Sequence, residues 1–108
     1  MSTEQEPGRL TPDRDLVQRM AGGDAHALAE LRHRHDGTLY ALAYAVLGDT
    51  RDATHVVSEV FLEAIRAATQ FDPARDHVPA WLSGILRQRA REVLQRRSPP
   101  FGVVAVRP

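Results

Sequence analysis

The apolar residues of this chain recur every three or four positions in long segments that glycine or proline separates. Between residues 24 and 48 they stand at Leu28, Leu31, Leu39, Leu42, Val46 and Leu47. Residues with this spacing share one side of a helix, so the pattern is typical of an amphipathic helix with one buried face. No segment alternates apolar and polar residues as a half-buried strand does. The sequence therefore predicts an all-α fold, a compact bundle of about four helices.

Turn and capping residues predict where the first two helices begin and end. Thr11-Pro12 is a start signal, with the threonine as N-cap and the proline at the first helical position, and Gly22-Gly23 stops that short helix. Asp24 is placed to cap the next helix and Gly48 to end it. Gly37 interrupts this helix at a cost of about 1 kcal/mol relative to alanine. We therefore expect a kink or a close helix contact there.

Two further helices follow. Thr50 opens the third, whose apolar face is Ala53, Val56, Val57, Val60, Phe61, Ala64, Ile65 and Ala68. The stretch from Phe71 to His77 contains Asp72-Pro73 and predicts a loop, and Pro79 starts the fourth helix. That helix offers a buried face of Trp81, Leu82, Ile85, Leu86, Val93 and Leu94 and a basic exposed face of Arg87, Arg91, Gln95 and Arg97.

The composition limits the domain plan and the location. We expect a flexible lead-in over 1–10, one helical domain over 11–97, and a linker or truncated tail over 98–108 after Ser98-Pro99-Pro100. There is no cysteine, which excludes disulfides and thiolate metal sites. No apolar run approaches the roughly 18 residues of a membrane span, and Met1 to Leu10 does not resemble a signal peptide. We expect a cytoplasmic protein without a membrane partner.

Catalytic and metal chemistry find little support. His33 and His35 are two residues apart, so on a helix they point in nearly opposite directions and cannot chelate one ion. Phosphate-binding loops and nucleophile elbows are absent, and Glu59 and Glu63 are better explained as a solvated helix face than as an acid–base pair. We expect no enzymatic activity, no metal and no cofactor.

The charge distribution singles out the fourth helix. Residues 1–74 hold seven arginines and twelve acids, whereas 75–108 hold seven arginines and two acids. Arginines can neutralise phosphates, and an aromatic side chain such as that of Trp81 can stack on an exposed base. A surface helix anchored by a core tryptophan explains the same residues equally well. The arginines in question are Arg87, Arg89, Arg91, Arg96 and Arg97.

Several motifs, in order and spacing, resemble region 2 of extracytoplasmic-function (ECF) sigma factors across roughly residues 13–97. They are Leu16-Val17 through Gly23-Asp24, Leu39-Tyr40-x-Leu42-Ala43, Leu47-Gly48-Asp49, Asp52-Ala53, Val56-Val57-x-Glu59-Val60-Phe61-Leu62, Phe71-Asp72-Pro73 and Ala80-Trp81-Leu82-x-x-Ile85. The motifs coincide with the helix boundaries derived above.

The resemblance implies two partners. The third helix would dock on the coiled coil of the β′ subunit of core RNA polymerase, through Asp52, His55, Val56, Ser58, Glu59 and Leu62. The loop and the fourth helix would receive the melted non-template strand of the −10 promoter element, with one base flipped out of the stack, through Asp76, His77, Trp81, Arg87, Gln88 and Arg91.

Departures from the family pattern leave alternatives open. The family motif Asp-x-x-Gln-Glu is replaced here by His55-Val56-Val57-Ser58-Glu59, and Gly84, Gln88 and Glu92 replace a bulkier residue, Asn and Asp. One alternative is a sigma-like interaction module that has lost promoter opening and binds an anti-sigma factor or another transcription protein. A more distant one is a small duplex-DNA-binding protein. Nothing resembles region 4, so the chain is either part of a longer factor or a naturally short protein that works with a second chain.

Overall fold

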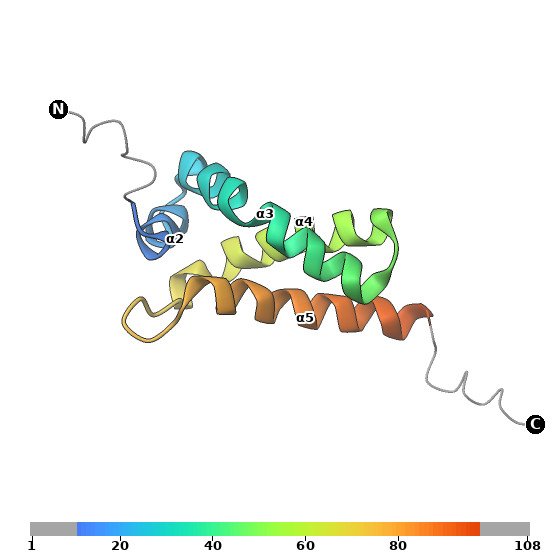
Figure 1. Ribbon diagram of the computed structural model, residues 1–108. Helices are drawn as coiled ribbons and strands as arrows, with labels where there is room; N and C mark the ends of the chain where they lie inside the picture. The colour runs from blue at the N-terminus through green and yellow to red at the C-terminus, as the bar shows by residue number, and fades with distance from the viewer. Residues whose placement is uncertain (1–10, 98–108) are drawn as a thin grey trace, which may run out of the picture.

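Within residues 11–97, the fold consists of four α-helices and one short 3-10 helix. The computed structural model describes residues 11–97. The elements are α2 (Asp13–Ala21), α3 (Ala25–Leu47), α4 (Thr50–Ala67), η2 (Ala68–Gln70) and α5 (Val78–Arg97). The helices α3, α4 and α5 lie alongside one another, and α2 packs near the start of α3 (Figure 1). The described part of the chain contains no strand, which confirms the prediction of an all-α bundle.

The first helix begins later than the sequence predicts. Pro12 is the N-cap of α2, not its first helical residue, and no side chain caps the helix. The reason is the backbone of Pro12, whose ψ of 148° is extended. Thr11 therefore lies outside the helix, and its carbonyl oxygen accepts a hydrogen bond from Arg34 (2.7 Å). Asp13 and Asp15 still occupy the first turn, where their charge is favourable.

The predicted ends of α3 are confirmed. The Asp24 carboxylate accepts hydrogen bonds from the backbone N–H groups of His26 (2.9 Å) and Ala27 (3.2 Å). The bond from Ala27, and after it the bond from Arg19, lowers the pKa of Asp24. Gly48 has a φ of 64°, the left-handed conformation in which glycine commonly ends a helix.

The core differs from the predicted apolar faces in a regular way. Leu31, Leu82 and Phe61 are buried as expected. Four large residues predicted to be buried are exposed instead: Leu42, Val46, Ile65 and Leu94. Two alanines outside the predicted faces, Ala43 and Ala90, are buried instead, beside the predicted Ala53 and Ala64. Small side chains therefore contribute more to the core than the spacing of large apolar residues predicts.

The glycine in the middle of α3 has no internal role. The helix runs without a break through Gly37. A methyl group built on Gly37 would meet nothing within 4 Å, so the predicted close helix contact at this residue is wrong.

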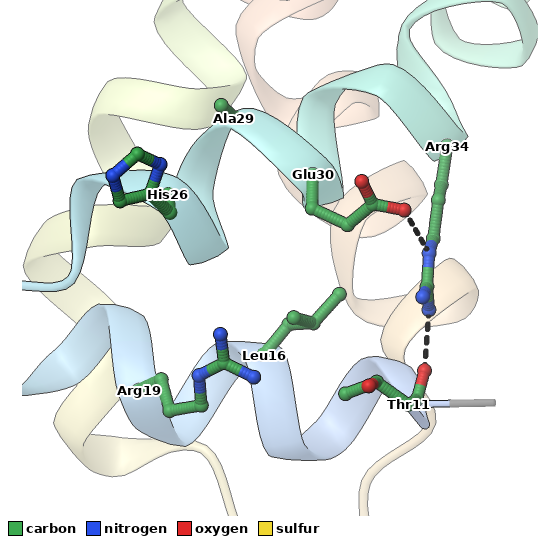
Figure 2. A pocket seen from close by; sticks show the side chains of 7 residues that line it. All are labelled: Thr11, Leu16, Arg19, His26, Ala29, Glu30 and Arg34. Atoms are coloured by element: carbon green, nitrogen blue, oxygen red, sulfur yellow. Dashed lines mark hydrogen bonds and ion pairs between the residues drawn. The ribbon is translucent and has the colours of Figure 1, made fainter. Parts of the chain in front are cut away.

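Ionic contacts attach α2 to α3. The Asp13 carboxylate accepts a hydrogen bond from Arg34 (2.9 Å) and lies 2.8 Å from Nε2 of His35. Within α3, Arg34 also donates to Glu30 (3.0 Å), and both residues line the hollow between α2 and α3 that Figure 2 shows. Burial lowers the pKa of Arg34, but the bonds to Asp13 and Glu30 outweigh it and raise that pKa overall. Arg34 therefore stays charged and joins the two helices.

Candidate nucleic-acid and polymerase interfaces

One side of α4 presents a row of four side chains, which we call the α4 stripe: His55, Leu62 and Arg66, which are exposed, and Glu59, which is half-buried. Their spacing of four, three and four residues places them on one face of the helix. Leu62 is 52% exposed and is the most exposed large apolar residue among the described ones. Nε2 of His55 lies 3.4 Å from the Glu59 carboxylate. The stripe combines an apolar centre with charged ends.

The other residues predicted to contact polymerase are placed differently. Val56 is 1% exposed and packs in the core, so its side chain is not available on this surface. Asp52 accepts a hydrogen bond from Arg97, which also donates to the Leu47 carbonyl oxygen (2.9 Å). Ser58 is half-buried beside α3. The structure therefore brings His55, Glu59 and Leu62 together but not all six residues.

The loop before α5 is held by its own acids. The Asp76 carboxylate accepts a hydrogen bond from the backbone N–H of Asp72 (2.8 Å), and the Asp72 carboxylate accepts one from Ala74 (3.0 Å). The backbone N–H of Asp76 donates to the Asp72 carbonyl oxygen (2.7 Å). Asp76 thus shapes the loop, whereas His77 is exposed next to it.

Trp81 joins this loop to α5. Its ring is partly buried and lies against Phe71, with 4.9 Å between the ring centroids. One edge lines a pocket of about 600 Å³ between α4 and α5, together with Gly84, Ile85 and Gln88. A core anchor with one exposed edge describes Trp81 better than a free stacking residue.

The basic face of α5 is narrower than the sequence predicts. Arg87 and Arg91 are exposed, and neither pairs with an acid among the described residues. Arg89, in contrast, bridges Glu63 (2.9 Å) and Glu92 (3.1 Å), and Arg97 holds Asp52. Two of the five arginines in the predicted basic stretch therefore serve the fold.

The Glu63–Arg89 contact is a feature that sequence reasoning missed. Burial lowers the pKa of Arg89, but the bond to Glu92 and the charge of Glu63 raise it overall. Glu63 also accepts a hydrogen bond from Arg66 of the α4 stripe (2.9 Å). Glu63 and Arg89 are 26 positions apart in the sequence, so no local pattern indicates that they are in contact.

The two arginines proposed to bind phosphates, Arg87 and Arg91, lie next to the pocket beside Trp81. Gln88 lines that pocket and accepts a hydrogen bond from Arg91 (3.3 Å). Its amide nitrogen lies 3.5 Å from the Glu92 carboxylate. A strand whose phosphates followed Arg87 and Arg91 would thus pass by a hollow that has Trp81 on its wall and that also includes Glu63 and Glu92, both paired with Arg89.

Metal binding and membrane insertion receive no support from the described residues. Within 11–97, no three histidines or acids are grouped so that they could hold a metal ion. His35 bonds to Asp13, and His33 is exposed to solvent. None of the helices described is both long and apolar enough to cross a bilayer.

Comparison with known proteins decides the family. Residues 31–99 match Sigma-70 region 2. The chain belongs to this family. The domain is also 38% identical over 85 residues to the ECF RNA polymerase sigma factor SigK of Mycobacterium tuberculosis, a match that covers 78% of this chain and 46% of the relative. The same values hold for SigK of Mycobacterium bovis.

A more distant relative extends the match along the chain. SigK of Mycobacterium sp. strain KMS is 28% identical over 118 residues, which covers 100% of this chain and 61% of the relative. The sigma region 2 domain spans about half the length of the first relatives it matches. No solved structure shows a significant match to it. The predicted resemblance to ECF sigma factor region 2 is confirmed.

Proposed function

We propose that this domain acts in transcription initiation in the cytoplasm, where it binds core RNA polymerase and captures the melted −10 non-template strand. The observation that carries the proposal is the separation of two exposed surfaces on adjacent helices of a sigma region 2 domain. The α4 stripe presents an apolar centre, and α5 presents unpaired arginines beside an aromatic-lined pocket.

The α4 stripe supports docking on a helical partner such as the β′ coiled coil. Leu62 offers apolar area that water covers in the free domain, and burial of such area favours association. Glu59 and Arg66 flank it with opposite charges, which suits an interface with a polar rim. The proposed contacts are His55, Glu59 and Leu62, with Asp52 and Ser58 at the margins.

The loop and α5 support capture of a single strand. Arg87 and Arg91 would neutralise phosphates, and the hollow beside Trp81 would receive one unstacked base. Each well-stacked base contributes about 1 to 3 kcal/mol. Strand opening by this route requires no bond chemistry, because captured bases shift the equilibrium toward melted DNA.

A direct binding experiment tests this function. Fluorescence anisotropy would compare a −10 non-template oligonucleotide with a scrambled one of equal composition, with and without mycobacterial core polymerase. We expect binding to polymerase, and salt-dependent affinity that favours the −10 sequence. Absence of both would refute the proposal, and preference for duplex DNA would favour a duplex-binding protein.

A second candidate function is a sigma-like interaction module for an anti-sigma factor or another transcription protein. His55 and Ser58 favour it, because they replace an acid and an amide of the family motif. The double variant His55→Asp, Ser58→Gln separates the two candidates. A marked rise in polymerase affinity would support the second, whereas unchanged affinity would remove its basis.

A further inference from the structure

A groove of about 330 Å³ separates α3 from α4 on the flank of the α4 stripe. Its walls are formed by residues of both helices: Arg32, Asp36, Gly37 and Tyr40 of α3 and Thr54, Val57 and Ser58 of α4. Ser58 lies four residues before Leu62 in α4, so the two side chains are neighbours on the helix surface and the groove borders the α4 stripe. The groove is therefore available to any helical partner that lies along α4.

Gly37 leaves this groove open, although a glycine in the interior of a helix lowers the stability of that helix. The residue lies in the interior of α3, where glycine is unfavourable relative to alanine. Its φ is not positive, and a methyl group there would meet nothing within 4 Å. Neither backbone conformation nor packing within the described chain requires a glycine. The absent side chain leaves space that an external group can occupy.

Asp36 gives the groove a negatively charged wall whose carboxylate lacks hydrogen-bond donors from residues 11–97 at one of its two oxygens. This carboxylate oxygen, Oδ1, is buried, has no hydrogen-bond partner among the described residues and lies 3.6 Å from Arg32, while the side chain as a whole is about half exposed. The Arg32 guanidinium lies over the buried Phe61 ring, 4.9 Å from the centroid, which holds it in place. Asp36 therefore has free capacity to accept hydrogen bonds from a second cation.

The remaining walls suit a basic side chain. The Tyr40 ring is stacked on Tyr44 with 6.2 Å between centroids, and an aromatic surface attracts a cation. The hydroxyl groups of Thr54 and Ser58 donate to and accept from no other group in the described part of the chain, so both can accept hydrogen bonds. A carboxylate, an aromatic ring and free hydroxyls around an open space match the needs of a guanidinium or ammonium group.

We propose that this groove receives an arginine or lysine side chain of the polymerase subunit that docks along the α4 stripe. The inference rests on the proposed function and adds the chemistry of one contact. In this chain a histidine occupies position 55, where the family motif has an acid. Asp36 supplies a negative charge from the neighbouring helix, so the docking surface keeps an anion although α4 has lost one.

Substitutions at Gly37 and Asp36 test the groove. Gly37→Leu adds a side chain at a position where its Cβ meets nothing within 4 Å, and Asp36→Asn removes the charge while keeping the shape. We expect each to weaken binding to mycobacterial core polymerase about tenfold, measured by biolayer interferometry. Thr38→Leu adds the same side chain one residue away, outside the groove lining, and should bind like wild type. Thermal unfolding of every variant checks the fold.

The outcomes separate this inference from the proposed function. Wild-type affinity of both Gly37→Leu and Asp36→Asn, with affinity lost in Leu62→Asp, would overturn the groove contact and leave the polymerase function standing. No binding by the wild-type domain would overturn both. Sedimentation that shows a wild-type dimer and a Gly37→Leu monomer would assign the groove to a second copy of the chain and overturn the proposal.

Discussion

The outer faces of α4 and α5 are both exposed, yet they differ in what they offer a partner. The α4 stripe has a half-exposed leucine between a histidine, an acid and an arginine, so its charges nearly cancel. On α5 the exposed arginines without an acid partner among the described residues are Arg87, Arg91 and Arg96, while Arg89 is already paired with acids. The first face offers apolar area and the second offers positive charge.

This difference implies different responses to salt. Apolar burial does not depend on ion screening at moderate concentrations, whereas phosphate contacts release counterions and weaken steeply as salt rises. The two proposed partners of one small domain can therefore be separated by ionic strength alone. Substitutions on one face should leave binding on the other unchanged.

The largest expected effect is on the α4 face. Leu62→Asp should weaken polymerase binding by about thirtyfold, or about 2 kcal/mol, because it places a charge in the centre of the interface. Binding of the −10 oligonucleotide to the free domain should not change. Leu42→Asp is the matched control, since Leu42 is similarly exposed but lies on α3, outside the stripe. Equal losses in the two variants would contradict the comparison.

A smaller effect is expected on the α5 face. Arg87→Ala and Arg91→Ala should each weaken oligonucleotide binding about fivefold at 0.1 M salt and lower the salt slope by about 0.7. The losses should be similar for −10 and scrambled sequences, because phosphate contacts carry little sequence information. Arg66→Ala removes an equal charge from α4 and serves as the control in the same anisotropy titration. A slope unchanged in all three variants would show that α5 does not hold the strand.

A stability difference should separate the arginines within α5. Arg89→Ala leaves Glu63 and Glu92 without their bridging cation and should lower the free energy of unfolding by about 1 kcal/mol. Arg87→Ala should change it by less than about 0.5 kcal/mol. Urea denaturation monitored by circular dichroism measures both. A larger loss of unfolding free energy in Arg87→Ala than in Arg89→Ala would contradict the assignment of Arg89 to the fold and of Arg87 to the free surface.

The smallest effect is expected away from both faces. Asp24→Ala removes the cap of α3 and should lower the melting temperature by a few degrees at neutral pH. Since folding lowers the pKa of Asp24, its contribution is present above the pKa of the unfolded chain and disappears as pH falls through the folded value. Thermal melts of both proteins should therefore converge in acid. Neither polymerase nor strand affinity should change.

Sequence reasoning was strongest where local chemistry decides the structure. Asp24 and Gly48 determine the ends of α3 through contacts with their own neighbours, and both were predicted correctly. Residues Leu42 and Ile65 were misplaced because hydrophobic spacing ranks large side chains above alanine, whereas close helix packing favours the alanine. The periodicity therefore predicted which side of each helix is buried. Packing between the helices decided which residues on that side are most deeply buried.

The candidate sites were harder to predict than the fold. The Arg97–Asp52 contact joins residues 45 positions apart, and no local pattern reveals it. In this contact Arg97 pairs with Asp52, an acid that the resemblance predicts to contact polymerase. The roles proposed for His55, Glu59, Trp81 and Arg91 stay predictions, because the resemblance identifies the surface without showing what it binds.

The hydrogen-bonded loop before α5 affects how fast a DNA strand can bind. The carboxylate and the backbone N–H of Asp76 both bond to the backbone of Asp72, and the Phe71 ring at the start of the loop contacts the Trp81 ring of α5. The loop therefore loses its conformational freedom when the domain folds and not when DNA arrives. Association needs no slow rearrangement of these residues, so the bimolecular rate constant should be set by encounter and electrostatic attraction, and affinity differences between sequences should appear in the dissociation rate.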